Sequence, residues 1–184
     1  MAPVERPVPC SFTSHLVVAT ESVVRIFVHV SSQTLDLLDA RGVLLRRYPC
    51  STSKFGIGTE RGSNRTPTGK FRIAEKHGDG APTGMIFKSR VPTGKFGSEE
   101  DDADHVQTRI LWLDGVDADN TNTKSRYIYI HGTNAESNLG TQASHGCVRM
   151  GNADIIDLYD TVPVGTVVEI SEESERKSPT KRRK

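Results

Sequence analysis

No run of apolar residues in this sequence approaches the roughly 20 that a membrane-spanning helix requires. A recognisable secretory signal is missing as well, because the longest uninterrupted apolar run within residues 1–22 is only Leu16-Val17-Val18-Ala19. We therefore expect a soluble chain without a transmembrane segment. Its location stays open between export by another route, removal of an earlier signal, and retention in the cytoplasm.

An excess of charge of either sign is also absent. Lys and Arg number 24 against 23 for Asp and Glu, and the formal net charge is +1. So small a net charge gives no argument for nucleic acid as a partner. The stretch SEESERKSPTKRRK, residues 171–184, has no apolar residue to bury and is predicted to be a charged disordered tail.

Cysteine is scarce, and the number of cysteines is odd. Cys10, Cys50 and Cys147 permit either one disulfide with one free thiol or three free thiols. Cysteine usage therefore does not identify the redox compartment. If one of the three is free for chemistry, its neighbours favour Cys147.

Helical periodicity is rare, and strand patterns dominate the chain. Runs rich in Val, Leu and Ile at residues 23–30, 33–39 and 43–50 are bounded by turn residues and predict a β-meander. Further strands are expected at residues 70–74, 85–87, 108–115, 126–133 and 166–170. The segment 76–106 is predicted to be a loop-rich insertion around one short strand, able to roof a site.

The one good helix signal comes after Met150. Ile155, Tyr159 and Val162 recur at i, i+4 and i+7 behind the capping pair Gly151-Asn152. One short helix among many strands predicts a mostly β domain, a sandwich or a barrel. We expect this single domain at residues 23–170, between an N-terminal extension at residues 1–22 and the tail.

The segment ASHGCVRM, residues 143–150, brings a cysteine, a histidine and an arginine together among small residues. His131 lies sixteen residues before Cys147, at the end of a predicted strand that would aim its side chain. A thiol of pKa about 8.5 needs a cationic or dipolar neighbour to ionise near neutral pH. We favour Cys147 as a nucleophile served by His131, because His145 is too close in sequence for easy proton abstraction.

Gly146 leaves space beside the sulfur, so the amides of Gly146 and Cys147 could approach an oxyanion. Two other interpretations compete with this one. Cys147 could be a small buried hydrophobe next to a turn, or His131, His145 and Cys147 could hold zinc. No second cysteine and no local histidine pair accompanies that triplet, so we expect neither a metal nor a cofactor.

HGT at residues 131–133, the sixteen-residue interval and SHGCVRM at residues 144–150 resemble the L,D-transpeptidase catalytic domain, the YkuD family. The likeness extends to YPCSTSKFGIGTERGSNRTPTGKF at residues 48–71 and covers about residues 23–170. The fold that this resemblance implies is mostly β.

The resemblance also implies a role for each matching residue. Cys147 would be the nucleophile and His131 the proton donor and acceptor. His145 and Gly146 would shape the oxyanion pocket, and Arg149 would anchor the turn or meet a substrate carboxylate. Structural hydrogen bonds are the favoured roles of Ser144 and Thr133, whereas Trp112, Tyr127 and Tyr129 are expected to be strand aromatics that pack.

The resemblance implies that the substrate is a peptidoglycan stem peptide. The stem would first acylate the enzyme and would then be transferred to an acceptor, which forms a crosslink. The acceptor could be an amine of a second stem or of a lipoprotein. Water as acceptor would make the chain an L,D-carboxypeptidase, and a non-enzymatic wall-binding or zinc-holding module is the remaining alternative. The resemblance further implies action in the cell envelope or periplasm and inhibition by a carbapenem.

Overall fold

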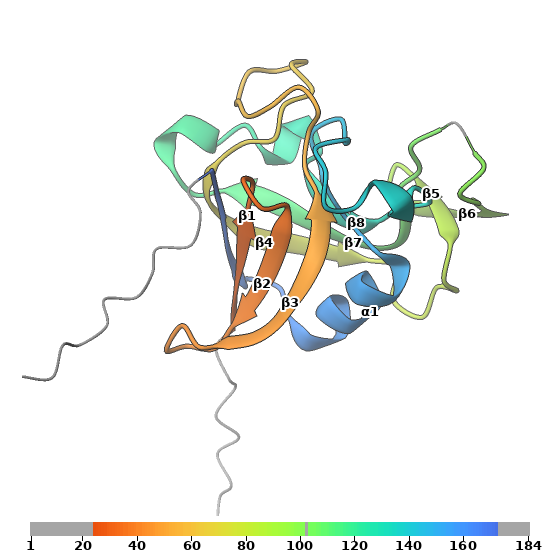
Figure 1. Ribbon diagram of the computed structural model, residues 1–184, viewed down its shortest axis with the longest axis horizontal. Helices are drawn as coiled ribbons and strands as arrows, with labels where there is room; N and C mark the ends of the chain where they lie inside the picture. Colours follow the sequence, from red (N-terminus) through yellow and green to blue (C-terminus); the bar gives the residue numbers. More distant parts are fainter. Residues whose placement is uncertain (1–23, 102, 173–184) are drawn as a thin grey trace, which may run out of the picture.

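The structure, a computed structural model, describes residues 24–101 and 103–172 (Figure 1). The predicted extension at residues 1–22, with Cys10, lies outside the described residues, and so do residues 173–184 of the predicted tail. Ser171, the first residue of that predicted tail, is instead the last residue of a strand. The folded part therefore continues past the boundary expected at residue 170.

Within the described residues the chain forms ten strands, one α-helix and three short 3-10 helices. The strands are β1 (Arg25–His29), β2 (Thr34–Leu38), β3 (Leu44–Ser51), β4 (Gly69–His77), β5 (Met85–Lys88), β6 (Val91–Phe96), β7 (Gln107–Gly115), β8 (Tyr129–Gly132), β9 (Val148–Met150) and β10 (Val167–Ser171). The helices are α1 (Asn152–Thr161), η1 (Ala118–Asn120), η2 (Lys124–Arg126) and η3 (Glu136–Asn138).

Most of these strands close into a barrel. Their order is β4-β10-β1-β2-β3-β9-β8-β7, and pairing of β7 with β4 closes the ring. The β5–β6 hairpin stands outside the ring, and Ile86 of β5 pairs with Gln107 at the start of β7 (Figure 1). The predicted meander is present as β1, β2 and β3. The predicted mostly β fold with one short helix after the cysteine is thus confirmed, and it is a barrel.

Alternation along the strands separates two buried faces where β7, β8 and β9 lie side by side. Leu111, Ile130 and Val148 point into the barrel and join its main core. Trp112 and Tyr129, one residue along their strands, belong to a second apolar cluster on the outer face, together with Phe87 of the β5–β6 hairpin. This part of the sheet is therefore covered on both sides.

The helix α1 begins directly after β9. Gly151 is its N-cap, and the Asn152 amide donates to a Glu136 carboxylate oxygen at 2.7 Å. Ile155, Leu158 and Tyr159 are buried against the barrel, as the apolar periodicity predicts. No helix in the described part of the chain is long and apolar enough to cross a membrane.

The insertion at residues 76–106 contains one strand more than we expect from its sequence. The extra strand is β6, VPTGKF, and all of its residues are exposed. The sequence pattern does not predict this strand, because it contains a proline and a glycine and lacks apolar alternation. It forms because it pairs with β5, from Met85↔Phe96 to Lys88↔Val91.

A buried charge cluster joins the meander on its outer face. Asp36 of β2 receives hydrogen bonds from Arg47 of β3 at 2.7 and 2.8 Å, and it contacts His29 of β1 at 2.9 Å. Burial alone would raise the pKa of Asp36, but the bonds from Arg47 and His29 outweigh it and hold the pKa below 3.8. The ionised carboxylate therefore stabilises the fold above that pH and ceases to do so as the pH falls through the lowered pKa.

We expect Asp36→Asn to lower the free energy of unfolding by about 2 to 3 kcal/mol, because it leaves a buried cluster without its anion while Arg47 keeps contact with solvent. Urea unfolding measures the change. Asp114→Asn, which breaks the more exposed pair with Arg72, is the matched control and should stay close to the parent. Equal losses for both variants would contradict the role assigned to this cluster.

Candidate active site

The parallel pairing of β8 with β9 brings the two segments of the predicted site together. Ile130 pairs with Val148 and His131 with Arg149. Cys147 immediately precedes β9, so its side chain lies on the same outer face as His131. The two residues line one pocket of about 280 Å³, together with Asp104, Val106 and His145. The structure thus brings Cys147, His131 and His145 to a single hollow.

The Cys147 sulfur is held by the backbone of β8 and of the residues just before it. The Tyr129 amide donates to Sγ at 3.4 Å, and the thiol faces the Tyr127 carbonyl at 3.5 Å. Its side chain packs against the outer apolar cluster and keeps partial access to solvent. Cys147 is therefore a positioned thiol and not a fully buried one.

Protonation of this thiol differs from our expectation of a thiolate stabilised near neutral pH. Burial raises the pKa of Cys147 to about 11, and the Tyr129 amide and nearby Arg149 only partly oppose that shift. At neutral pH the resting group is the thiol. Its proton must leave when the sulfur attacks, so a base has to be at hand.

His131 is the group in the pocket that can act as this base. Its Nδ1 lies 2.8 Å from the Gly132 carbonyl oxygen, which only accepts, so Nδ1 carries the proton and Nε2 keeps its lone pair. Burial lowers the pKa of His131 below 6.5, so the imidazole is neutral at pH 7. The site rests as a neutral thiol with a neutral imidazole.

The turn before Cys147 is shaped by Gly146 and Ser144. Gly146 has φ +121°, in the region that favours glycine, and its carbonyl accepts from Thr66 Oγ1 at 3.0 Å. Ser144 Oγ donates to the Cys147 carbonyl at 2.6 Å and accepts from the Gly146 amide at 3.3 Å. Since the Gly146 amide already has this partner, the Cys147 amide is the better placed of the two proposed oxyanion donors.

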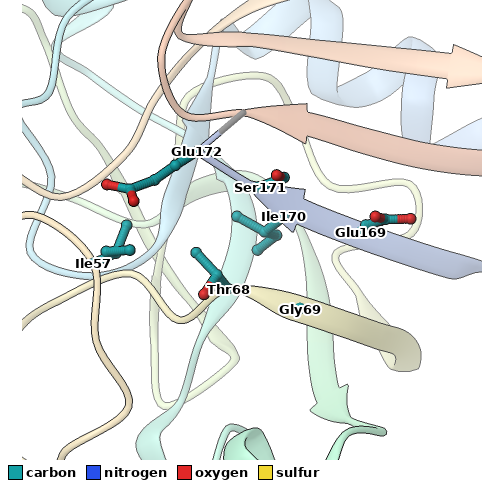
Figure 2. A pocket seen from close by; sticks show the side chains of 7 residues that line it. All are labelled: Ile57, Thr68, Gly69, Glu169, Ile170, Ser171 and Glu172. Atoms are coloured by element: carbon teal, nitrogen blue, oxygen red, sulfur yellow. The ribbon is translucent and has the colours of Figure 1, made fainter. Parts of the chain in front are cut away.

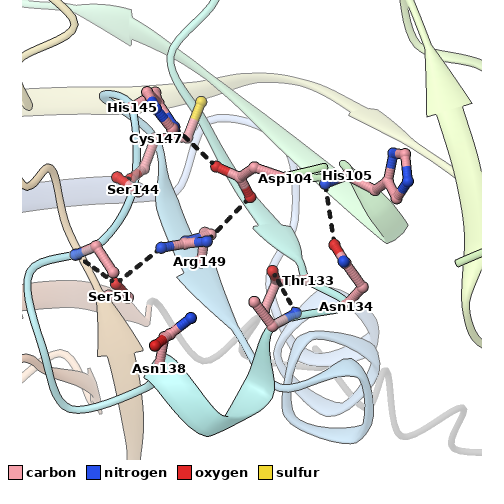
Figure 3. A network of polar contacts seen from close by, with 12 residues as sticks. Ser51, Asp104, His105, Thr133, Asn134, Asn138, Ser144, His145, Cys147 and Arg149 are labelled. Atoms are coloured by element: carbon pink, nitrogen blue, oxygen red, sulfur yellow. Dashed lines mark hydrogen bonds and ion pairs between the residues drawn. The ribbon is translucent and has the colours of Figure 1, made fainter. Parts of the chain in front are cut away.

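Asp104 joins two further site residues, His145 and Arg149, as Figure 3 shows. Its carboxylate contacts Arg149 Nη1 at 3.0 Å and His145 Nδ1 at 3.2 Å. Arg149 is only 3% exposed and lies 3.5 Å from Ser51 Oγ as well. These contacts favour the anchoring role of Arg149 over contact with a substrate carboxylate. Asp104 could not be identified from the sequence, because it lies in the acidic run EEDDADH, which resembles a solvated loop.

The loop that carries Asp104 is fastened by a second residue that sequence reasoning missed. Asn134 Nδ2 donates to carbonyls of Ser98, Asp101 and Ala103, at 3.2, 3.4 and 3.0 Å. Its Oδ1 accepts from the His105 amide at 3.0 Å (Figure 3). Asn134 follows the HGT motif directly, so the end of β8 fixes the acidic loop beside the pocket.

Thr133 and the three aromatic residues lie around this centre. Thr133 is fully buried, its Oγ1 accepts from the Ala135 amide at 3.1 Å, and its carbonyl accepts from Asn152 at 2.8 Å. Trp112 and Tyr129 are buried in strands as expected. Tyr127 is not the strand residue we expect, because it follows η2 in a left-handed conformation and is 55% exposed, although its ring does pack on Trp112.

The zinc alternative has a geometric requirement that the described residues do not meet. Although His131, His145 and Cys147 line the same pocket, no group of three His, Cys, Asp or Glu side chains within residues 24–101 and 103–172 is arranged to hold a metal ion. Cys50 is a buried free thiol away from this pocket, and burial raises its pKa to about 12.

A separate hollow of about 260 Å³ lies beside the start of β4 and the end of β10 (Figure 2). It is lined by Ile57, Thr68, Gly69, Glu169, Ile170, Ser171 and Glu172. This lining has two carboxylates but neither a nucleophilic side chain next to a base nor any predicted site residue. The candidate chemistry therefore belongs to the pocket at Cys147.

Comparisons with known proteins agree with this fold and motif. A profile of the YkuD family, described as the L,D-transpeptidase catalytic domain, matches residues 23–170. The YkuD protein of Bacillus subtilis, named as a candidate L,D-transpeptidase, is 30% identical over 147 residues, which are 79% of this chain and 65% of that protein. The chain thus spans less than two thirds of the length of this relative.

Solved structures of low sequence identity share the fold. L,D-transpeptidase 3 from Mycobacterium tuberculosis, with a faropenem-derived adduct, is 20% identical with a TM-score of 0.54, over 82% of this chain and 61% of that one. An L,D-transpeptidase in complex with imipenem is 19% identical with a TM-score of 0.52, over 82% and 59% of the two chains. With the profile match, these findings define the class: the chain belongs to the YkuD family of L,D-transpeptidase catalytic domains.

Alkylation of Cys147 by iodoacetamide should be slow at neutral pH, because the raised pKa keeps the thiol protonated. The rate should increase about tenfold per pH unit between about pH 8 and about pH 10, as the thiolate fraction grows. Mass spectrometry of the labelled peptide follows Cys147 separately from Cys10 and Cys50, with Cys147→Ala as the blank. A rate that is already maximal at pH 7 would show a resting thiolate and contradict the neutral pair.

Proposed function

We propose that this chain is a peptidoglycan L,D-transpeptidase in which Cys147 forms a thioester with a stem peptide. The observation that supports this most is the meeting of a partly accessible Cys147 thiol and a neutral His131, with Nε2 free of a proton, in the wall of one pocket. Peptidoglycan crosslinks lie outside the cytoplasm, so the proposed place of action is the cell envelope.

In the first half-reaction the Cys147 proton passes to His131 Nε2 while Sγ attacks the carbonyl carbon of the third stem residue. The Cys147 amide, in the turn behind the sulfur, stabilises charge on the carbonyl oxygen. The carbon–nitrogen bond then breaks, and His131 returns the proton to the nitrogen of the departing D-amino acid. A thioester on Cys147 and a neutral His131 remain.

In the second half-reaction an amine resolves the thioester. Its nitrogen attacks the thioester carbonyl and loses a proton to His131 Nε2, and that proton returns to Sγ as the carbon–sulfur bond breaks. An amine of a second stem peptide gives a 3→3 crosslink. Water in the same place would release the shortened stem, and the chain would then act as an L,D-carboxypeptidase.

Asp104 supports an amine over water as the acceptor. Its carboxylate lines the pocket of Cys147 and is 26% exposed, although it also contacts Arg149 and His145. A negative group at the pocket wall attracts the ammonium form of an acceptor, which gives up one proton to solvent before its nitrogen attacks, and it gives no such preference to water. Mass spectrometry of products from a stem tetrapeptide separates the two outcomes, because transpeptidation yields a dimer and hydrolysis yields only a shortened monomer.

Removal of the base should slow the reaction strongly. His131→Ala should reduce kcat for stem-peptide acyl transfer by about 10²- to 10⁴-fold, the usual contribution of a positioned acid and base. In the parent chain kcat/KM should fall with decreasing pH only below 6.5, because burial lowers the pKa of His131. Unchanged turnover in His131→Ala would remove this residue from the mechanism.

A carbapenem should acylate the chain once, at Cys147. A strained β-lactam carbonyl needs only the first half-reaction, so the identity of the acceptor does not enter. Intact-protein mass spectrometry after incubation with imipenem should show one added imipenem on the parent chain and none on Cys147→Ala. An unshifted parent mass would argue against acyl transfer, and a shift that persists in Cys147→Ala would assign the label to another residue.

A further inference from the structure

Arg90 lies on an aromatic shelf formed by Trp112 and Tyr127, whose rings stack with centroids 5.8 Å apart. Its guanidinium carbon is 4.2 Å from the Trp112 centroid and 5.6 Å from the Tyr127 centroid. Nη1 also donates to the Tyr129 hydroxyl at 3.1 Å. Two ring contacts and one hydrogen bond thus fix the plane of this guanidinium.

No carboxylate within the described residues pairs with Arg90. Neighbouring Lys124 is paired, since its Nζ lies 2.9 Å from Glu75 Oε1. Within residues 24–101 and 103–172, the hydrogen bond of the Arg90 side chain is the one from Nη1 to Tyr129. Arg90 therefore presents an oriented cation without a carboxylate partner, and its fork is one that a carboxylate can bind with two parallel hydrogen bonds.

The backbone at Arg90 is unfavourable for its residue type. Ser89 has φ +51° and Arg90 has φ +69°, both left-handed, at the tip of the β5–β6 hairpin between Lys88 and Val91. A two-residue turn of this kind favours asparagine and glycine. Strained residues at such turns are retained where the surrounding contacts fix them, and here the contacts are those of the Arg90 side chain with the shelf.

The shelf is directly connected to the candidate nucleophile. Tyr129, which binds Arg90 through its hydroxyl, donates its amide to Cys147 Sγ at 3.4 Å, and the Tyr127 carbonyl lies 3.5 Å from the same sulfur. Arg90 also lines a hollow of about 410 Å³ together with Met85 and Phe87, which belong to the apolar cluster that Cys147 packs against. Arg90 and Cys147 thus line separate hollows that border the same apolar cluster, with the segment from Tyr127 to Tyr129 between them.

We propose that Arg90 determines specificity by binding a carboxylate of the acyl-donor peptide, a role that rests on the proposed function of the pocket at Cys147. Stem peptides have several carboxylates, and the shared chemistry is a planar anion that accepts two hydrogen bonds from the guanidinium. Arg90 supplies the unpaired positive charge at the shelf, because the charge of the neighbouring Lys124 is offset by its partner Glu75. Asp79 also lines the hollow, and its negative charge repels an anion from that part of the wall.

The test measures binding without turnover, so that it does not depend on the reaction. Isothermal titration calorimetry uses the full chain with Cys147→Ala and a stem tetrapeptide with diaminopimelate at its third position and D-alanine at its fourth. Versions of this peptide with one carboxylate at a time converted to an amide identify the group that is bound. In the Cys147→Ala chain, the amide of the bound carboxylate should raise Kd by about 10- to 50-fold, the usual effect of losing a charge-assisted pair.

When Arg90→Gln is added to the Cys147→Ala chain, Kd for the unmodified peptide should rise by the same factor. Kd for the peptide in which the bound carboxylate is an amide should not rise any further. Arg90→Lys keeps the charge without the fork and should give an intermediate Kd. Lys95→Gln removes an exposed cation from β6 of the same hairpin and is the matched control, expected to bind like the parent.

The proposal is overturned if Arg90→Gln leaves Kd unchanged, if it weakens every peptide equally, or if no peptide binds. If the proposed function itself were wrong, the chain with Cys147 intact would not turn over a stem peptide, which is a different result from these. Thermal unfolding of each variant shows whether the hairpin is kept. Because Arg90→Lys retains the ring contact, its comparison with Arg90→Gln still tests the fork if glutamine loosens the turn.

Discussion

The arrangement of the site depends on the parallel pairing of β8 with β9. Because His131 pairs with Arg149 in this register, Cys147 and His131 end on the same outer face, while Ile130 and Val148 fill the barrel. A slip of one residue would turn each of these side chains to the opposite face. The apolar alternation of the two strands thus fixes the register, and the register fixes which polar groups meet outside the barrel. The hairpin and the acidic loop then cover this outer face, which raises the pKa of the thiol and lowers that of the imidazole.

The neutral state of the thiol and imidazole has a chemical consequence. An ionised pair would hold the thiolate ready at all times, and it would react with any electrophile that reached it. Two neutral groups, held by the Tyr129 amide and the Gly132 carbonyl, keep the sulfur unreactive until a carbonyl carbon is in place and proton transfer is coupled to attack. The proposed acylation therefore depends on the position of His131 beside the thiol. Because the bond to Gly132 occupies Nδ1, Nε2 is free to accept the proton.

Much of this could be predicted from local sequence patterns. The meander, the helix after Met150 and the strand that ends at His131 follow from alternation and capping, and the HGT and SHGCVRM segments identify the family. What escaped prediction depends on contacts between distant segments. β6 has no apolar alternation, Asp104 lies in an acidic run, and Arg90 is a single basic residue in a loop. The protonation states escaped as well, because they depend on how deeply the folded chain buries two side chains.

The most direct test of this account is to capture the acyl-enzyme itself. The chain is mixed with a stem tetrapeptide in the absence of an amine acceptor, quenched in acid and analysed by intact-protein and peptide mass spectrometry. The account predicts a thioester adduct on Cys147 that has lost the terminal D-amino acid, and no adduct on Cys147→Ala. Release of the D-amino acid by Cys147→Ala at the rate of the parent chain would contradict it.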